Sequence, residues 1–208
     1  MKNHVLIFDF DGTIADTFHT IVEISNRLAD EFQYKKMTLP QAELMKDNTV
    51  KETITQLQIP LLKIPLIIAK AKDELFKGIA NIDPVLDLKE TLVELKTLGT
   101  HLGILTSNSA KNVEEFLKNH DLQVFDFIKT TSKIWSKDHH LSKIVDDYNF
   151  NINDVIYVGD EARDIVAAKR CGVKVAAVTW GYNSAKTLLA NNPDYLLNHP
   201  QELLTLIN

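Results

Sequence analysis

Short apolar runs alternate with segments of helical spacing along most of this chain. The apolar runs occupy residues 5–8, 101–105, 125–129, 155–158 and 173–178. The segments between them predict helices from Pro84 to Leu98, up to Leu117, from Asp138 to Tyr148 and up to Arg170. Short apolar runs that end in polar turn residues are typical of buried parallel strands. The alternation therefore predicts an α/β protein whose parallel sheet has helices on both faces.

Residues 16–83 depart from this alternation. They have helical patterning and almost no strand signal, and Thr49 and Glu52 have the spacing of a helix-capping box. Strand signals resume only after this segment. We therefore interpret it as a helical insertion between two parts of the core, residues 1–15 and 84–208.

Composition narrows the possible classes of protein. Of the 208 residues, 45% are hydrophobic and 25% are charged, which is ordinary for a folded protein of one domain with an insertion or of two small domains. A net charge of -5 and the lack of a basic stripe argue against nucleic acid as a partner. Cys171 is the only cysteine, so no internal disulfide can form.

No segment of the sequence has the length and composition of a membrane span. The apolar run before Asp9 is also too short for the core of a signal peptide, so we expect a cytoplasmic protein with no membrane partner. The apolar stretch at residues 61–68 is explained by packing inside the insertion, with a dimer interface as the alternative. Both a monomer and a homodimer therefore stay open.

Three predicted strands end in polar residues that can take part in chemistry. Asp9 and Asp11 follow the first apolar run, and Asp160 follows the fourth. Thr106 and Ser107 follow the second. Because the carboxyl ends of parallel strands lie along one edge of a sheet, we expect these side chains to converge. Carboxylates held close together repel each other, which implies a cation beside them or a shared proton.

Several of these residues also have a plain structural explanation. Aspartate and glycine are common in turns, and Thr106 could cap the helix that follows it, although Asn108 or Ser109 could do so instead. Residues 180–183 follow the last predicted strand, where they either line a cleft or form an aromatic corner packed on the last helix.

Taken together, the motifs resemble the four ordered motifs of the haloacid dehalogenase superfamily. They are residues 9–13, Thr106, Lys137, and Gly159-Asp160 followed by Asp164. Within that superfamily the chain is most similar to the phosphoglycolate phosphatase-like hydrolases, whose helical cap is inserted between the first and second motifs. The resemblance covers the whole chain. It implies a Rossmann-like catalytic core at 1–15 and 84–208 with a helical cap domain at 16–83.

The resemblance also implies magnesium-dependent hydrolysis of a small phosphorylated metabolite. Asp9 is then the nucleophile that forms an aspartyl-phosphate, and Asp11 is the acid and base that serves the leaving group and the water. Mg²⁺ is expected on the Asp9 side chain, the Asp11 backbone carbonyl and Asp160, because oxygen ligands favour magnesium.

A second group of residues is expected to bind the phosphate. Thr106 and Ser107 would donate hydrogen bonds to it, and Lys137 would pair with both the phosphate and Asp9. Lys137 lies 23 residues before Asp160, within the twenty-odd residues that related enzymes show, whereas Lys143 lies only 17 before it. Asp164 is expected to orient Lys137 or a metal-bound water.

Two other functions remain as alternatives. A phosphomutase acting on a sugar phosphate would use the same core, and a non-catalytic phospholigand-binding protein could keep the fold. A dehalogenase is disfavoured because that branch lacks the second acid of the first motif, which is Asp11 here. Phosphoglycolate is one candidate substrate, suggested by the family alone.

Overall fold

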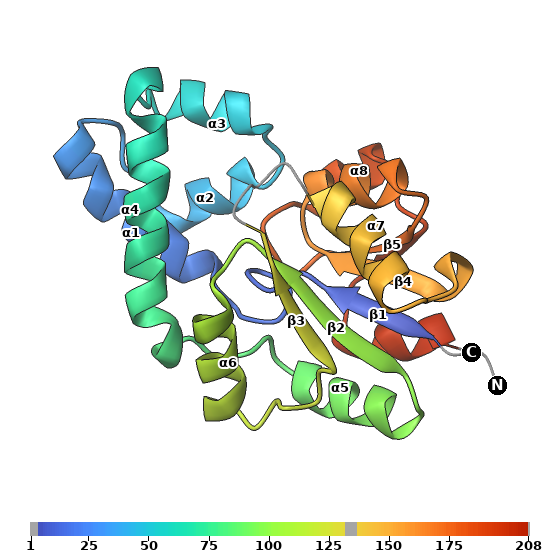
Figure 1. The fold of residues 1–208 in the computed structure, drawn as a ribbon. Coiled ribbons are helices and arrows are strands. Elements are labelled where there is room, and N and C mark those ends of the chain that lie inside the picture. Colours follow the sequence, from blue (N-terminus) through green and yellow to red (C-terminus); the bar gives the residue numbers. More distant parts are fainter. Residues whose placement is uncertain (1–3, 132–136, 208) are drawn as a thin grey trace. The chain divides into compact units, whose positions relative to one another are not determined.

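The structure, a computed structural model, describes residues 4–131 and 137–207 (Figure 1). Within these ranges, six parallel strands form one sheet in the order β3-β2-β1-β4-β5-β6. The strands are β1 Val5–Phe8, β2 His101–Thr106, β3 Phe127–Thr130, β4 Val155–Gly159, β5 Lys174–Val178 and β6 Tyr195–Leu197. This sheet confirms the predicted α/β fold. Its order reverses between β1 and β4, and ligands bind at such points in open α/β sheets.

The strand register brings the candidate residues to this same point. Phe8, the last residue of β1, lies beside Ile104 of β2 and Val158 of β4. The ladder continues one step further, because the Asp9 N–H donates to the Val158 carbonyl at 2.8 Å. Asp9 and Asp160 therefore both lie just beyond the carboxyl ends of neighbouring strands.

Helices cover both faces of the sheet. They are α5 Leu88–Thr97, α6 Ala110–Asn119, α7 Lys137–Asp147, α8 Ala162–Arg170 and α9 Ala185–Ala190, with 3-10 helices η3 Ile152–Asp154 and η4 Pro200–Ile207. On the face of α7 and α8, Leu141 and Ile165 pack with Ile7 and Tyr157 in one buried cluster. Helix α5 packs beside η4 below the strands in Figure 1. Residues of β1 are buried from both sides, which explains why its apolar run does not alternate with polar residues.

The segment Thr17–Ile82 forms a second compact unit, distinct from the unit that holds the sheet. Its helices are α1 Phe18–Phe32, α2 Leu39–Met45, α3 Val50–Gln56 and α4 Ile64–Gly78, with 3-10 helices at Leu61–Lys63 and Ile79–Asn81. The capping box predicted at α3 is confirmed: Thr49 Oγ1 accepts from the Glu52 N–H, and Glu52 accepts from the Thr49 N–H. The unit begins and ends one residue inside the expected insertion, 16–83.

Two predicted elements begin later than expected. No helix begins at Pro84, because this residue forms a bridge with Ala15 and the following Val85 N–H bonds to Ile14; α5 starts at Leu88. Strand β3 starts at Phe127, two residues later than expected. The residue before it, Asp126, accepts the Leu102 N–H with its side-chain carboxylate at 2.9 Å.

The apolar stretch 61–68 does not pack wholly inside its unit, contrary to our first interpretation. Leu61 is 72% exposed and Leu62 is 99% exposed, whereas Ile67 is buried. Leu61 and Leu62 belong to the short 3-10 helix before α4, and within α4 only one side, which includes Ile67 and Leu75, is buried. In the described part of the chain, no single helix could span a membrane, although the bent pair Val50–Gln56 and Leu61–Gly78 has sufficient length and apolar content together.

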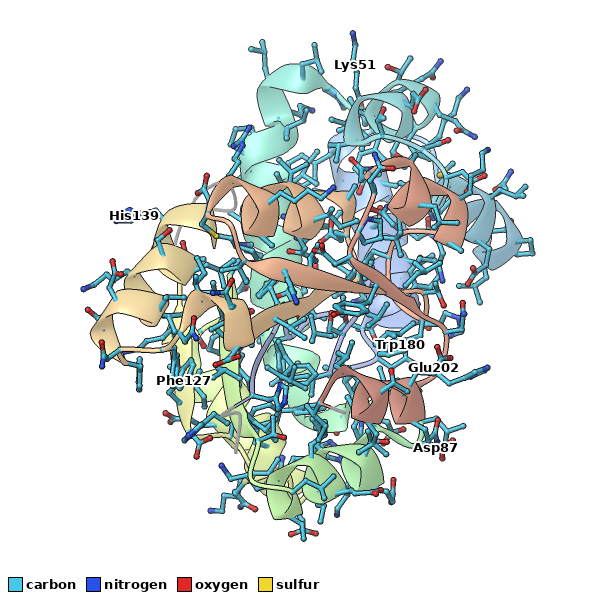
Figure 2. The ribbon with its side chains drawn as sticks, turned by 90° about the vertical axis from the view of Figure 1, so that its right-hand side faces the viewer. Lys51, Asp87, Phe127, His139, Trp180 and Glu202 are labelled. Atoms are coloured by element: carbon cyan, nitrogen blue, oxygen red, sulfur yellow. The ribbon has the colours of Figure 1, made fainter. Side chains whose placement is uncertain are left out.

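Gly103 in β2 leaves room for the ring of Phe127 on the neighbouring strand (Figure 2). A Cβ at this glycine would lie 2.1 Å from Phe127 Cζ, far inside van der Waals contact. The ring also stacks on Tyr148 with centroids 4.5 Å apart, which limits its freedom to move away. The side chain at position 103 is therefore excluded by packing.

We expect Gly103→Ala to lower the free energy of unfolding by about 1–3 kcal/mol, the usual cost of overpacking. Chemical denaturation measures the effect. In a Phe127→Leu background the same substitution should cost less, because the smaller side chain makes room. An equal cost in both backgrounds would show that the Phe127 ring is not what excludes a side chain here.

Candidate functional site

Three buried carboxylates meet beyond the ends of β1 and β4. They belong to Asp9, Asp160 and Asp164, and one oxygen from each lies within 4.8 Å of the others. Asp164 comes from the first turn of α8, which directly follows Asp160 in the chain. A set of carboxylate oxygens this close matches the ligands that a hard divalent cation prefers. The donor set therefore fits a cation of that kind.

Lys137 supplies positive charge from the first residue of α7. Its Nζ lies 2.5 Å from Asp9 Oδ2 and 2.7 Å from Asp164 Oδ1, and its side chain is only 3% exposed. Burial alone disfavours the ammonium form, but the Asp164 and Asp9 carboxylates outweigh it and hold the pKa of Lys137 well above its usual value. Lys137 is therefore a permanent cation in contact with Asp9.

The cluster nevertheless carries an excess of negative charge. Burial raises the pKa of Asp9, although Lys137 opposes the shift. Burial raises the pKa of Asp160 well above its usual value, and the charges of Glu161, Asp164 and Asp9 add to the effect. Repulsion of this kind is relieved when a divalent cation binds between the carboxylates, so the electrostatics agree with the donor set.

Asp160 is held by two hydrogen bonds. Thr13 Oγ1 donates to its Oδ1 at 2.7 Å, and the Tyr182 N–H donates to its Oδ2 at 2.7 Å. Trp180, which follows β5 and is labelled in Figure 2, donates from Nε1 to the Thr13 carbonyl at 3.1 Å. These bonds place Trp180 and Tyr182 next to Thr13 and Asp160, and the expectation that residues 180–183 line a cleft stays a prediction.

Two glycines leave the space that this carboxylate fills. A Cβ at Gly12 would lie 2.4 Å from Asp160 Oδ2, and one at Gly181 would lie 2.1 Å from the same atom. Gly12 also has φ +78, which disfavours any other residue. Asp160 is thus enclosed by backbone on two sides.

Asp11 lies beside the end of β2 rather than in the three-carboxylate group. Asn108 Nδ2 donates to its two oxygens at 3.2 and 3.3 Å. The metal contact expected of Asp11 involves its backbone carbonyl and not its side chain, and it stays a prediction. Asp11 is also half-buried, whereas Asp9 and Asp160 are buried, so the two acids of the first motif have different surroundings.

Thr106 is fully buried at the end of β2, and the half-buried Ser107 follows it. Thr106 Oγ1 accepts the Asn108 N–H at 3.0 Å. It does not cap α6, because that position belongs to Ser109, whose Oγ accepts the Asn112 N–H at 3.3 Å. The capping alternative for Thr106 is therefore wrong.

Sequence reasoning did not identify the ion pair between Glu161 and Arg163. Arg163 Nη2 donates to Glu161 Oε1, and its Nε is buried without a partner among the described residues. Burial disfavours the Arg163 cation, but Glu161, Asp164 and Asp9 together raise its pKa. The only signal in the sequence was the position of both residues within three residues of Asp160, where a helix start also explains an acid.

Comparison with known proteins places these features in a family. The family model described as haloacid dehalogenase-like hydrolase matches residues 6–178. The chain is 32% identical to a phosphoglycolate phosphatase of Synechococcus elongatus over 200 residues, covering 96% of this chain and 94% of that protein. It is 27% identical to the pyrophosphatase PpaX of Bacillus mycoides, covering 100% and 98%.

A solved structure agrees with the fold. The haloacid dehalogenase-like family hydrolase of Streptococcus pneumoniae has a TM-score of 0.79 at 20% identity, with 100% of this chain and 99% of that chain covered. The resemblance drawn from residues 9–13 and the later motifs is confirmed by these comparisons.

We expect Asp160→Asn to raise the free energy of unfolding of the metal-free protein, because it removes a buried carboxylate whose pKa is raised. A carboxyl group of this kind costs stability in full above its folded pKa. The cost declines as the pH falls from that value toward the unfolded pKa, near 3.8. The advantage of the variant should therefore be largest at high pH and should shrink as the pH is lowered toward the unfolded pKa. Denaturation curves at several pH values in chelator measure it.

The exposed Asp146 provides the matched control, since Asp146→Asn changes the same formal charge away from the site. Excess Mg²⁺ should then raise the Tm of the unsubstituted protein and of the control, but not that of Asp160→Asn. A magnesium shift that persists in Asp160→Asn would contradict a metal role for this carboxylate.

Proposed function

Because this chain belongs to the haloacid dehalogenase-like hydrolase family and is a phosphatase, we propose that it is magnesium-dependent and hydrolyses a small phosphomonoester through an aspartyl-phosphate. The observation that carries the proposal is the environment of Asp9. Its carboxylate is buried, in contact with the Lys137 ammonium, and within a group of three carboxylates that fits a divalent cation. A buried acid with this charge arrangement suits a nucleophile toward an anionic phosphate.

The two oxygens of Asp9 have different partners. The Phe10 N–H donates to Oδ1 at 2.8 Å, and Lys137 donates to Oδ2 at 2.5 Å. These bonds fix the carboxylate plane before substrate binds, which lowers the entropic cost of reaching the attacking geometry. In the first step an Asp9 oxygen bonds to phosphorus and the bond from phosphorus to the ester oxygen breaks.

Asp11 serves both steps as acid and then base. It gives a proton to the leaving ester oxygen, and afterwards takes one from the water that attacks the acyl-phosphate. The second step releases inorganic phosphate and restores the Asp9 carboxylate, so the proton returned to Asp11 completes the cycle. A different environment for the two acids is what such a division of roles requires.

Thr106, Ser107 and Lys137 bind the phosphoryl oxygens in this proposal. Asp164 holds Lys137 in place through the 2.7 Å contact between Oδ1 and Nζ. Mg²⁺ held by Asp9, Asp160 and the Asp11 backbone carbonyl would offset the repulsion between the nucleophile and the phosphate. Positive charge fixed before the reaction stabilises the charge that develops on the phosphoryl group.

The substrate is a small phosphorylated metabolite. Relatives named phosphoglycolate phosphatase and pyrophosphatase make phosphoglycolate and pyrophosphate the first compounds to test. We propose that the helical segment 16–83 is the cap domain and residues 1–15 and 84–208 are the catalytic core. A cytoplasmic location, a monomeric or homodimeric state, and the absence of membrane and nucleic-acid partners stay predictions.

Asp9→Asn should remove turnover by several orders of magnitude, as losses of covalent nucleophiles do. Phosphate release from an aryl phosphate with Mg²⁺, and then with excess chelator, measures it. Thermal unfolding shows whether the variant is folded, and mass spectrometry excludes deamidation back to aspartate. Normal turnover in the intact Asp9→Asn variant would rule out the aspartyl-phosphate. A separate assay of the unsubstituted protein with a sugar phosphate would identify a mutase if it yields an isomerised sugar phosphate without free phosphate.

Asp11→Asn should slow hydrolysis of an alkyl phosphate more than that of an aryl phosphate, because an aryl leaving group needs little protonation. Steady-state kcat on the two substrates measures the difference, and we expect a ratio of about tenfold or more, within the usual range for acid catalysis. Equal losses on both substrates would contradict the acid role.

A further inference from the structure

The amide of Asn108 has a fixed orientation. Its Oδ1 accepts the Ser109 N–H at 2.8 Å and Asn112 Nδ2 at 3.1 Å. Because the oxygen takes these two donors, the amide nitrogen must face the other way. That nitrogen donates to Oδ1 and Oδ2 of Asp11 at 3.2 and 3.3 Å. The contact with Asp11 is therefore set by groups on α6, not by Asn108 alone.

Asn112 is an unusual residue for its position. It is 1% exposed on the buried side of α6, where Val113 and Phe116 are also buried. A buried amide costs free energy unless its polar atoms are paired, and an apolar residue would pack there without that requirement. Its Nδ2 bonds to Asn108 Oδ1. The hydrogen bond that satisfies the buried Asn112 amide is thus made to Asn108, the residue that contacts Asp11.

We propose that Asn112 and Asn108 are positioning residues that hold the Asp11 carboxylate in the orientation used for proton transfer. The inference rests on the proposed function, in which Asp11 is the acid and base. Asn108 contacts both carboxylate oxygens with one NH2 group, so it restrains the position of the carboxylate. A carboxylate oxygen has two lone pairs, so the bond from Asn108 does not by itself prevent proton transfer.

The same residue connects Asp11 to the phosphate-binding side. The backbone N–H of Asn108 donates to Thr106 Oγ1 at 3.0 Å, while its side chain bonds to Asp11. Asn108 therefore contacts both Asp11 and Thr106, the predicted phosphate-binding residue, and restrains the distance between them. Misplacement of a catalytic group by about 1 Å can cost about 100-fold in rate, so this spacing matters for turnover.

The test compares alkyl and aryl phosphate hydrolysis in Asn108→Ala and Asn112→Leu, the latter chosen to keep the side-chain volume. We expect Asn108→Ala to lower kcat on the alkyl phosphate by about tenfold, with a smaller loss on the aryl phosphate, because only the former needs the proton. Asn112→Leu should show the same selectivity with a smaller loss. KM should change little in both variants.

Ser109→Ala is the matched control. It removes the side-chain cap of α6 and so lowers stability, but leaves the Ser109 N–H on Asn108 Oδ1. A destabilised α6 alone should therefore leave the alkyl-to-aryl ratio unchanged. A changed ratio in Ser109→Ala would show that the selectivity reports on stability and would overturn the positioning role.

A double-mutant cycle with Asp11→Asn completes the test. In that background Asn108→Ala should cause almost no further loss, because the group that it positions is already removed. Additive losses, or equal losses on both substrates, would overturn the proposal. If the wild-type protein turns over substrate in a way that needs Asp9 but the losses are additive, only the positioning role is overturned. If the wild-type protein turns over neither substrate, the proposed function is overturned and this role with it.

Discussion

The buried contact of Lys137 with Asp9 and Asp164 determines how the rest of the site is built. The lysine lies at the start of α7, and its partners lie after β1 and at the start of α8. Removing the cation would leave two carboxylates buried without a counter-charge, which is among the most costly defects in a protein interior. The three elements must therefore pack closely enough to keep the ammonium between the two acids.

Lys137 does not neutralise all the buried carboxylates around it. Asp160 stands beside the pair and is fixed by Thr13 and by the backbone of Tyr182, with glycines on two sides. The hydrogen bonds prevent the carboxylate from turning away from its like-charged neighbours. The fold thus holds negative charge in a place where it is unfavourable, which is typical of a site prepared for a cation.

The sequence was most informative where apolar patterning and motif order agreed. Strands β1, β2, β4 and β5 were predicted nearly in full, because each is a continuous apolar run between turn signals. Strand β6 was missed, since its three residues are too short to show a pattern. The later start of α5 was missed because the pairing of Pro84 with Ala15 depends on residues distant in sequence.

For the site, motif spacing selected Asp9, Lys137 and Asp160 for the place where the structure brings them together. It could not reveal how Asn108 is oriented or that Arg163 turns toward Glu161, because both depend on side-chain conformation rather than residue type. The function of Trp180 and its neighbours was also left open. Hydrogen bonds between distant parts of the chain show that Trp180 contacts Thr13 and that Tyr182 contacts Asp160.

Those long-range bonds have a consequence for the order in which parts of the site form during folding. Thr13 bonds to Asp160 across 147 residues, and Trp180 bonds to Thr13 across 167. A chain still lacking residues 180–183 has the acids of the first motif but cannot enclose Asp160. Contacts of such long range form late in folding, since the closure of large loops must come first. A metal site built on Asp160 would therefore require that residues 9–13 and 180–183 have already been brought together.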